Sequence, residues 1–440
     1  MRRLIHSLSF LNEHGGNILN GYLITNDDRI EELSGGVCPH DTAFFDEVID
    51  GTNRLLLPGF VNTHGHAAMS LLRGFADDLP LQSWLSDLIW PAEDLLTPDD
   101  IYLGTQLAML EMIETGTTTF TDMYFHMDRV ADAVIESGMR AVLGRGLVAV
   151  GDGGDKSLAE SEAFIRDYHL AGNGRVHTNL APHAPYTCSA DYLKKVMNVA
   201  DKLQLPIQIH VSESKSEVED SYKQYGVSPI KWLADLGVFH FPVVAAHCVH
   251  ISDEDINLLQ KHRVHVAHNP GSNLKLGSGI APLIAMLDAG IQVGIGTDGA
   301  SSNNKLDMFD EMRLAALIHK GHNLQATAID AQTALGLVTE QGAKTLFLDA
   351  ELGKLTPGSP ADFQLVDISG PRYYPRHSLL SHAVYSSHGG DVTDVFVAGN
   401  PLLRNREHVT LDKEKILSAA SRIGAKFQPI KDRYESQNKR

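Results

Sequence analysis

Apolar segments with strand character alternate with amphipathic segments along most of this chain of 440 residues, and this alternation constrains its fold more than any other feature. The pattern is typical of parallel β-strands joined by crossover helices. Helical character is found at residues 100–114, 190–203, 253–261 and 281–289, several of which follow a Ser or Thr that can cap a helix. The strand-like segments number eight: residues 55–63, 117–123, 140–148, 176–181, 206–211, 243–248, 264–269 and 291–297. Eight such units predict an α/β fold, a (β/α)8 TIM-like barrel with its functional residues at the carboxyl ends of the strands.

The two ends of the chain lack this alternation. Residues 1–57 contain short strand patterns with Gly and Asn-Asp turns, and residues 358–405 have the same texture. Neither end is long enough to bury a core by itself. We therefore predict a small composite β-sandwich domain built from both chain ends, a barrel domain over residues 58–357, and a charged C-terminal helical extension over residues 406–440 that packs on the surface.

Composition excludes several classes of protein. The formal net charge of −18 argues against binding to nucleic acid, which demands basic surfaces. No apolar run approaches the roughly 18 residues of a membrane span, so no membrane partner is expected. The three cysteines, Cys38, Cys188 and Cys248, are too few for a disulfide framework. These properties indicate an enzyme of the cytoplasm.

Residue types that bind metals stand at the ends of the strand-like segments. His64 and His66 follow the first segment, and residues i and i+2 of a strand point to the same side. His210, His247 and Asp298 stand at the ends of three later segments. Because the strands of a parallel barrel bring their carboxyl ends together, we expect these side chains to meet. Histidine and carboxylate ligands without paired cysteines are typical of a catalytic zinc site with a position open for water.

Longer motifs around these residues resemble a known family. The shared motifs are PGFVNTHGH at 58–66, HVSE at 210–213, AHC at 246–248 and GTDG at 296–299. They resemble the amidohydrolase superfamily. Further segments at 70–81, 91–94, 268–276 and 302–304 resemble, more narrowly, the 5′-methylthioadenosine/S-adenosylhomocysteine deaminases, and the likeness runs from about residue 1 to 405. Triazine chlorohydrolases share much of the same framework.

The resemblance implies a metal site and the residues that work beside it. The metal is usually zinc in this family, another divalent metal such as iron is a second option, and the ligands would be His64, His66, His210 and Asp298. Asp298 would also orient the attacking water and accept its proton. Glu213 would protonate a purine ring nitrogen and then relay a proton to the leaving ammonia. His247 would stabilise the attacking oxygen.

The resemblance also implies contacts to an adenine nucleoside, the small-molecule partner it predicts. Glu93, in the long excursion of residues 67–98, would accept hydrogen bonds from both ribose hydroxyls. His183 would contact the nucleoside, and Arg145 would bind the carboxylate of a homocysteine tail. Some members carry a second arginine about a dozen residues beyond the first, and this chain has none at 151–156. That departure argues against tight binding of S-adenosylhomocysteine and leaves methylthioadenosine untouched.

The function that follows is zinc-dependent hydrolytic deamination of the adenine 6-amino group of 5′-methylthioadenosine and S-adenosylhomocysteine, with adenosine as a further substrate. The sequence is compatible with a homo-oligomer. The first alternative is hydrolysis of an aminotriazine or another aminopurine by the same chemistry. The second is a non-catalytic binding barrel, which would require missing ligand positions. The sequence argues against a cytidine-deaminase-type enzyme, because the His-x-Glu and Pro-Cys-x-x-Cys signature of that class is absent.

Overall fold

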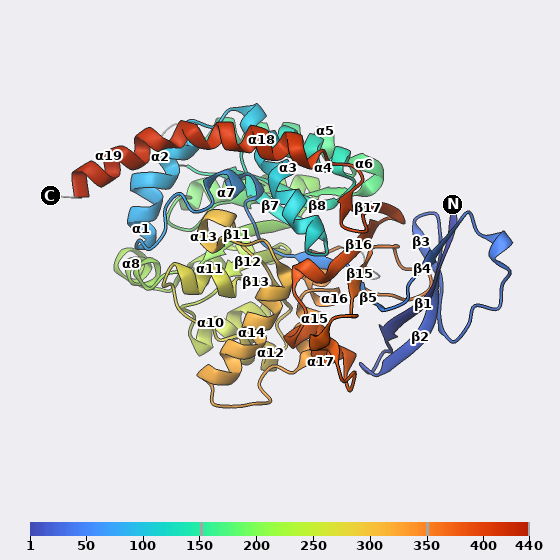
Figure 1. The fold of residues 1–440 in the computed structure, drawn as a ribbon. Coiled ribbons are helices and arrows are strands. Elements are labelled where there is room, and N and C mark those ends of the chain that lie inside the picture. Colours follow the sequence, from blue (N-terminus) through green and yellow to red (C-terminus); the bar gives the residue numbers. More distant parts are fainter. Residues whose placement is uncertain (150–152, 349–351, 439–440) are drawn as a thin grey trace.

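A closed ring of parallel strands forms the centre of the molecule (Figure 1). The computed structural model describes residues 1–149, 153–348 and 352–438. Thr63 N donates to Ile295 O at 3.0 Å and Gln208 N donates to Leu180 O at 2.8 Å, so hydrogen bonds join the two parallel sheets at both edges. The strands of the ring are β6 (Phe60–Asn62), β7 (Thr117–Tyr124), β8 (Arg140–Leu147), β9 (Val176–Thr178), β10 (Ala181–Pro182), β11 (Ile207–Val211), β12 (Val243–His247), β13 (His265–His268) and β14 (Val293–Ile295). The (β/α)8 prediction is confirmed. β9 and β10 both pair with β8 and together take the place of one of the eight barrel strands.

The prediction of a single barrel strand over residues 55–63 is wrong. Residues 55–63 divide into β5 (Arg54–Pro58), which pairs antiparallel with β15 (Phe363–Asp367) of the small sheet, and β6, which pairs parallel with β7. The break falls at Pro58 and Gly59, where the chain passes between the two sheets. A Cβ on Gly59 would lie 2.2 Å from the Thr118 side chain, so only glycine fits this crossing.

Helices cover the outside of the ring. Ser and Thr residues cap several of them: for example, Thr97 forms a capping box with Asp100, Ser189 accepts a hydrogen bond from Tyr192 N, and Ser252 forms a capping box with Asp255. All four predicted helices are present. The helices around the barrel are α3 (Pro98–Glu114), α4 (Met127–Ser137), α5 (Gly154–Tyr168), α6 (Ala171–Gly174), α7 (Ala190–Leu203), α8 (Lys215–Tyr225), α9 (Pro229–Leu236), α10 (Asp253–Lys261), α11 (Pro270–Lys275), α12 (Leu283–Asp288), α13 (Ala300–Asn303), α14 (Met308–His322), α15 (Ala331–Leu337), α16 (Glu340–Thr345) and α17 (Leu379–Tyr385).

The excursion between β6 and α3 has short helical turns of its own. They are η2 (Ala67–Leu72), α1 (Leu81–Ser83), the π-helical η3 (Trp84–Ile89) and α2 (Trp90–Glu93). These turns lie over the carboxyl ends of the strands, because several of their residues line the pocket described below.

Both chain ends contribute to a second sheet, which lies to one side of the barrel (Figure 1). Its strands run in the order β18-β17-β16-β15-β5-β1-β2-β3, with β4 beside β1. Ile5 and Leu23 from the first end share a core with Phe363 and Phe396 from the second, as the composite domain requires. The strands not yet given are β1 (Arg2–Leu11), β2 (Asn17–Asn26), β3 (Arg29–Gly35), β4 (Glu47–Asp50), β16 (Val392–Val397), β17 (Asn400–Arg404) and β18 (Glu407–His408).

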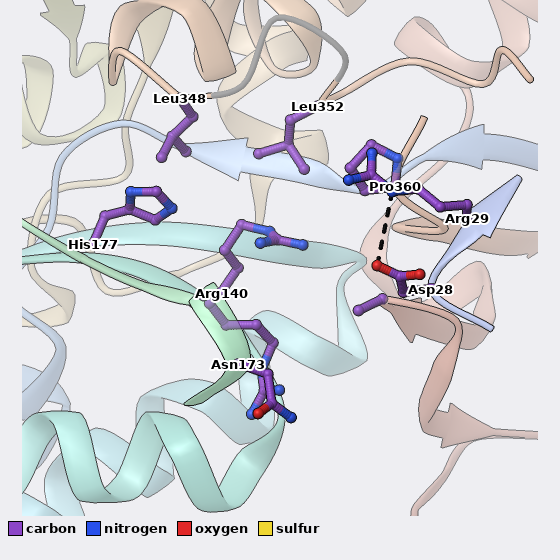
Figure 2. A pocket seen from close by; sticks show the side chains of 11 residues that line it. Asp28, Arg29, Arg140, Asn173, His177, Leu348, Leu352 and Pro360 are labelled. Carbon is purple, nitrogen blue, oxygen red and sulfur yellow. Dashed lines mark ion pairs between the residues drawn. The ribbon is translucent and has the colours of Figure 1, made fainter. Parts of the chain in front are cut away.

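An ion pair joins this sheet to the barrel. Arg140 at the start of β8 binds Asp362 at 3.1 Å, and the Asp362 side chain is almost fully buried. Beside the pair lies a cavity of about 240 Å³ that Arg29, His177 and Pro360 also line (Figure 2). It lies at the amino-terminal end of β8, the end of a barrel at which residues serve stability.

The C-terminal helices α18 (Lys413–Gly424) and α19 (Gln428–Asn438) run across the top of the barrel in Figure 1, and α19 ends on the side away from the N-terminus. Phe427, between them, is buried and lies 5.8 Å from Phe75, ring centre to ring centre. Lys426 binds Asp100 of α3 at 2.6 Å. No helix among the residues that the structure describes is long and apolar enough to cross a membrane.

Candidate active site

The ends of β6, β11, β12 and β14 bring five side chains to one place. His66 Nε2 lies 3.3 Å from His210 Nε2 and 3.3 Å from Asp298 Oδ1. The His64 ring lies edge-on to that of His210, with centres 4.8 Å apart, and to that of His247, with centres 5.3 Å apart. Two groups, His64 with His66 and Asp298, and His64 with His210 and His247, have their ligand atoms within 4.8 Å of one another. The predicted meeting of these residues is therefore found.

The hydrogen bonds of two histidines aim their free nitrogens at the same point. His66 Nδ1 donates to Met123 O at 2.7 Å, and His210 Nδ1 donates to His183 O at 2.7 Å. Burial and the neighbouring histidines hold the pKa of His210 well below its usual value, so its ring is neutral. A neutral ring that donates from Nδ1 has a lone pair on Nε2. The Nε2 atoms of His66 and His210 lie 3.3 Å apart beside the Asp298 carboxylate, an arrangement that fits a cation between them.

His64 completes the donor set from the floor of the site. Its side chain is fully buried, and among the described residues its Nε2 has no hydrogen-bond partner; this nitrogen lies 3.7 Å from Asp298 Oδ1. Gln208 Nε2 lies 3.0 Å from the other ring nitrogen and fixes the ring orientation. Burial, and then the neighbouring histidines, lower the pKa of His64 and keep it neutral. A buried nitrogen without a partner, beside two histidines and a carboxylate, fits a divalent metal.

Backbone geometry and a serine orient Asp298. Its φ is +62°, in the left-handed region that non-glycine residues rarely adopt. Ser272 Oγ donates to Oδ2 at 2.6 Å and Gly299 N donates to Oδ1 at 2.7 Å. His247, at the end of β12, also has a positive φ of 74°. Strain of this kind clusters at functional sites, where it fixes the direction of a side chain.

Glu213 and His247 face each other beside the candidate metal donors. Glu213 Oε2 lies 3.8 Å from His247 Nε2, and Ser278 Oγ lies 3.5 Å from the other carboxylate oxygen. Burial raises the pKa of Glu213. Burial lowers the pKa of His247, but the carboxylates of Glu213 and Asp298 outweigh it and raise that pKa overall. His247 Nδ1 donates to Asn273 Oδ1 at 2.8 Å, which directs Nε2 toward Glu213.

The sequence did not reveal Glu217, which supports Glu213. The Glu217 carboxylate accepts hydrogen bonds from Ser212 N at 2.8 Å and from Glu213 N at 2.9 Å, and burial raises the pKa of Glu217 to about 7. Glu217 therefore differs from its neighbours Glu219 and Asp220, which are exposed. A signal was present: Ser214 caps α8 and accepts Glu217 N, and a Ser followed by Glu three residues later is typical of a helix start.

A pocket of about 1070 Å³ opens from this site. The residues predicted from the sequence that line it are His66, Glu93, Arg145, His183, His210, Glu213, His247 and Asp298. Tyr124 Oη donates to Glu93 Oε1 at 2.7 Å, and burial raises the pKa of Glu93 to about 7. His183 bonds Thr187 Oγ1 at 3.0 Å and lies with its ring centre 4.9 Å from that of His210. Burial lowers the pKa of His183 to about 4.

Arg145 lies in the pocket but is already paired. Its Nη2 lies 3.1 Å from Glu160 Oε2 of α5, and its Nη1 donates to Gly146 O. The segment that lacks a second arginine, residues 151–156, is described from residue 153 onward, and residues 151 and 152 lie outside the described residues.

The chain belongs to the amidohydrolase family, whose sequence profile matches residues 55–402. Over 430 residues it is 48% identical to the 5-methylthioadenosine/S-adenosylhomocysteine deaminase of Syntrophomonas wolfei, covering 97% of this chain and 99% of that protein. It is also similar to the zinc-bound crystal structure of an adenosine deaminase from Xanthomonas campestris, with a TM-score of 0.92, 33% identity, and coverage of 97% and 98% of the two chains. The atrazine chlorohydrolase of Arthrobacter aurescens superposes with a TM-score of 0.87 at 23% identity, covering 96% and 100%, a likeness that shows the fold alone.

Proposed function

We propose that this protein hydrolyses the 6-amino group of adenine in 5′-methylthioadenosine and S-adenosylhomocysteine and releases ammonia. The observation that carries the proposal is the acid–base pair of Glu213 and His247 placed against a set of metal donors, within one pocket. The substrate class comes from the deaminases that share 45–50% identity with nearly the whole chain or most of it.

His64, His66, His210 and Asp298 would hold the metal, which we assign as zinc because the donors are histidines and a carboxylate. Such a metal lowers the pKa of a bound water to about 7 and supplies a nucleophile at neutral pH. Hydrogen bonds to Met123 O and His183 O keep the His66 and His210 rings in the tautomer that binds through Nε2. The Ser272 hydroxyl leaves Oδ1 of Asp298 turned toward the histidines.

Asp298, Glu213 and His247 would handle the protons and the attacking oxygen in the proposed reaction. Asp298 accepts the proton that the attacking water gives up. Glu213 protonates the ring nitrogen next to the amino-bearing carbon, and burial, which raises the pKa of Glu213, favours the protonated carboxyl that this step needs. His247 donates a hydrogen bond to the attacking oxygen. The proton held by Asp298 then passes to the amino group and ammonia leaves. The hydroxyl proton that remains on the attacking oxygen passes to Glu213 and restores its carboxyl, so that a 6-oxopurine remains.

The rest of the pocket would hold the nucleoside. Glu93 has one carboxylate oxygen on Tyr124, and the carboxylate can accept both ribose hydroxyls. His183 lines the pocket beside His210 and would contact the nucleoside. Trp84 and Trp90 line the same pocket and would pack on the apolar 5′-thio substituent.

A substrate panel separates this function from its competitors. Ammonia release is measured with methylthioadenosine, S-adenosylhomocysteine, adenosine, guanine, cytosine and melamine at equal concentration. We expect the two 5′-thio nucleosides to give the highest kcat/KM. Preference for melamine would instead assign the chain to triazine hydrolysis, the chemistry of its 23% identical neighbours.

A further inference from the structure

The end of the pocket formed by β8 and α5 contains three charged side chains. Arg145, Lys156 and Glu160 all line it. The Glu160 carboxylate lies between the two cations, with Oε2 at 3.1 Å from Arg145 Nη2 and Oε1 at 3.8 Å from Lys156 Nζ. We call these three residues the charged triad.

Charge is unbalanced within the charged triad. Two cations share one carboxylate, which leaves an excess of one positive charge. The nearby Asp167 does not balance it, because Arg166 binds that carboxylate at 2.8 Å. Arg145 is about four-fifths buried, so its charge is screened less by water than that of Lys156, which is largely exposed. The triad therefore favours a ligand that brings a carboxylate to Arg145.

A carboxylate on Arg145 would release Glu160. The Glu160 carboxylate would then be available to pair with a positively charged group of the ligand. A ligand with a carboxylate and an ammonium group on one carbon supplies a partner for Arg145 and a partner for Glu160. Of the charged groups in the triad and the ligand tail, only Lys156 is then unpaired. A ligand with an uncharged tail leaves the Arg145–Glu160 pair intact.

We propose that Glu160 is a specificity-determining residue that reads the ammonium group of an amino-acid tail and holds Arg145 when no such tail is bound. This inference rests on the proposed function and extends it, because it names 5′-thioadenosines with a zwitterionic tail as ligands that the charged triad recognises.

Four 5′-thioadenosines test the inference by their kcat/KM for ammonia release. Their 5′-thio substituents are methyl, the full homocysteine tail, 3-aminopropyl, which lacks the carboxylate, and 3-carboxypropyl, which lacks the ammonium. Each is measured with the wild type, Glu160→Gln, Arg145→Met and Glu162→Gln. Glu162 is the matched control because it also lies on α5, pairs with Lys202 at 3.8 Å and does not line the pocket.

We expect Glu160→Gln to lower kcat/KM for the aminopropyl compound about threefold to fivefold relative to the methyl compound, the scale of a partly exposed ion pair. The same variant should raise kcat/KM for the carboxypropyl compound, because Arg145 has lost its competitor. Arg145→Met should lower kcat/KM for the carboxypropyl compound and leave the aminopropyl compound without loss. Glu162→Gln should leave all ratios as in the wild type.

Equal changes for all four compounds in Glu160→Gln would overturn the inference, as would parallel losses for the aminopropyl and carboxypropyl compounds. In both cases deamination of the methyl compound by the wild type would leave the proposed function standing. If the wild type released ammonia from none of the four, the proposed function would fall and the inference with it.

Discussion

Glu217→Gln tests whether the Glu217 carboxylate, which binds the backbone of Glu213, influences the rate of the reaction. In the wild type this carboxylate accepts the backbone N–H groups of Ser212 and Glu213 at 2.8 and 2.9 Å. A glutamine has one acceptor oxygen and one NH2 group, so one backbone N–H would face a second donor. A buried donor without an acceptor costs about 1–3 kcal/mol, and a shift of the Glu213 backbone relieves it. Losing about 1.4 kcal/mol of transition-state stabilisation in this way lowers kcat about tenfold.

Stability and pH distinguish this loss of position from unfolding. Burial raises the pKa of Glu217 from 4.5 to about 7, so the folded protein holds a proton that the unfolded chain releases. The wild type therefore loses stability as the pH rises from 4.5 through 7, and the neutral glutamine avoids that loss. We expect the variant to unfold at no lower urea concentration than the wild type at pH 8. Below pH 7 the wild-type carboxyl is protonated and, like an amide, is a poorer acceptor, so the difference in kcat should narrow at pH 6.

The assay is ammonia release at pH 6 and pH 8, with bound metal measured by elemental analysis and urea unfolding followed by circular dichroism. Glu219→Gln is the matched control, because Glu219 lies on the same helix, is exposed and pairs with Lys215 at 3.5 Å. A Glu217→Gln variant with wild-type kcat at pH 8 would refute the reasoning. So would a loss of the same size in Glu219→Gln.

Three further predictions follow from the same site. Glu213→Gln should keep its metal and lose turnover by at least about a hundredfold, whereas His210→Ala should lose both, which elemental analysis and ammonia release distinguish. Prolonged chelation should abolish activity and added Zn²⁺ should restore it; full activity in metal-free protein would contradict the donor set. Glu93→Gln removes a carboxyl whose pKa burial raises from 4.5 to about 7. A carboxyl whose pKa is higher in the folded than in the unfolded protein lowers the stability of the fold as the pH increases. The free energy of unfolding of Glu93→Gln, relative to that of the wild type, should therefore be higher at pH 8 than at pH 4.5 by up to about 3 kcal/mol, as measured by urea unfolding. A difference between variant and wild type that does not change with pH would count against the raised pKa.

The sequence predicts the barrel and the metal donors because both depend on position along strands. Hydrophobic segments indicate where each parallel strand ends, and the barrel topology then brings His64, His210 and Asp298 together without any knowledge of side-chain contacts. The same reasoning is wrong for residues 55–63, because a continuous apolar run does not reveal that Pro58 and Gly59 carry the chain from one sheet to another.

Contacts between side chains were not predictable in the same way. Gln208 at His64 and Ser272 at Asp298 are uncharged residues in apolar or Gly-rich surroundings, and only their direction shows that they orient the donors. The pairing of Arg145 with Glu160 joins a strand to a helix, and residue spacing alone does not fix which carboxylate an arginine meets. Element order is therefore visible in the pattern, whereas the direction of each side chain depends on packing.

The central claim is that water replaces the amino group of the purine ring and that the bond to the sugar stays intact. The most direct measurement is mass spectrometry of the product formed from methylthioadenosine in H2(18O), with ammonia measured in the same sample. The account predicts one labelled oxygen on the purine of an otherwise whole nucleoside, with one ammonia released for each product molecule. Free adenine, or a product without the label, would contradict it.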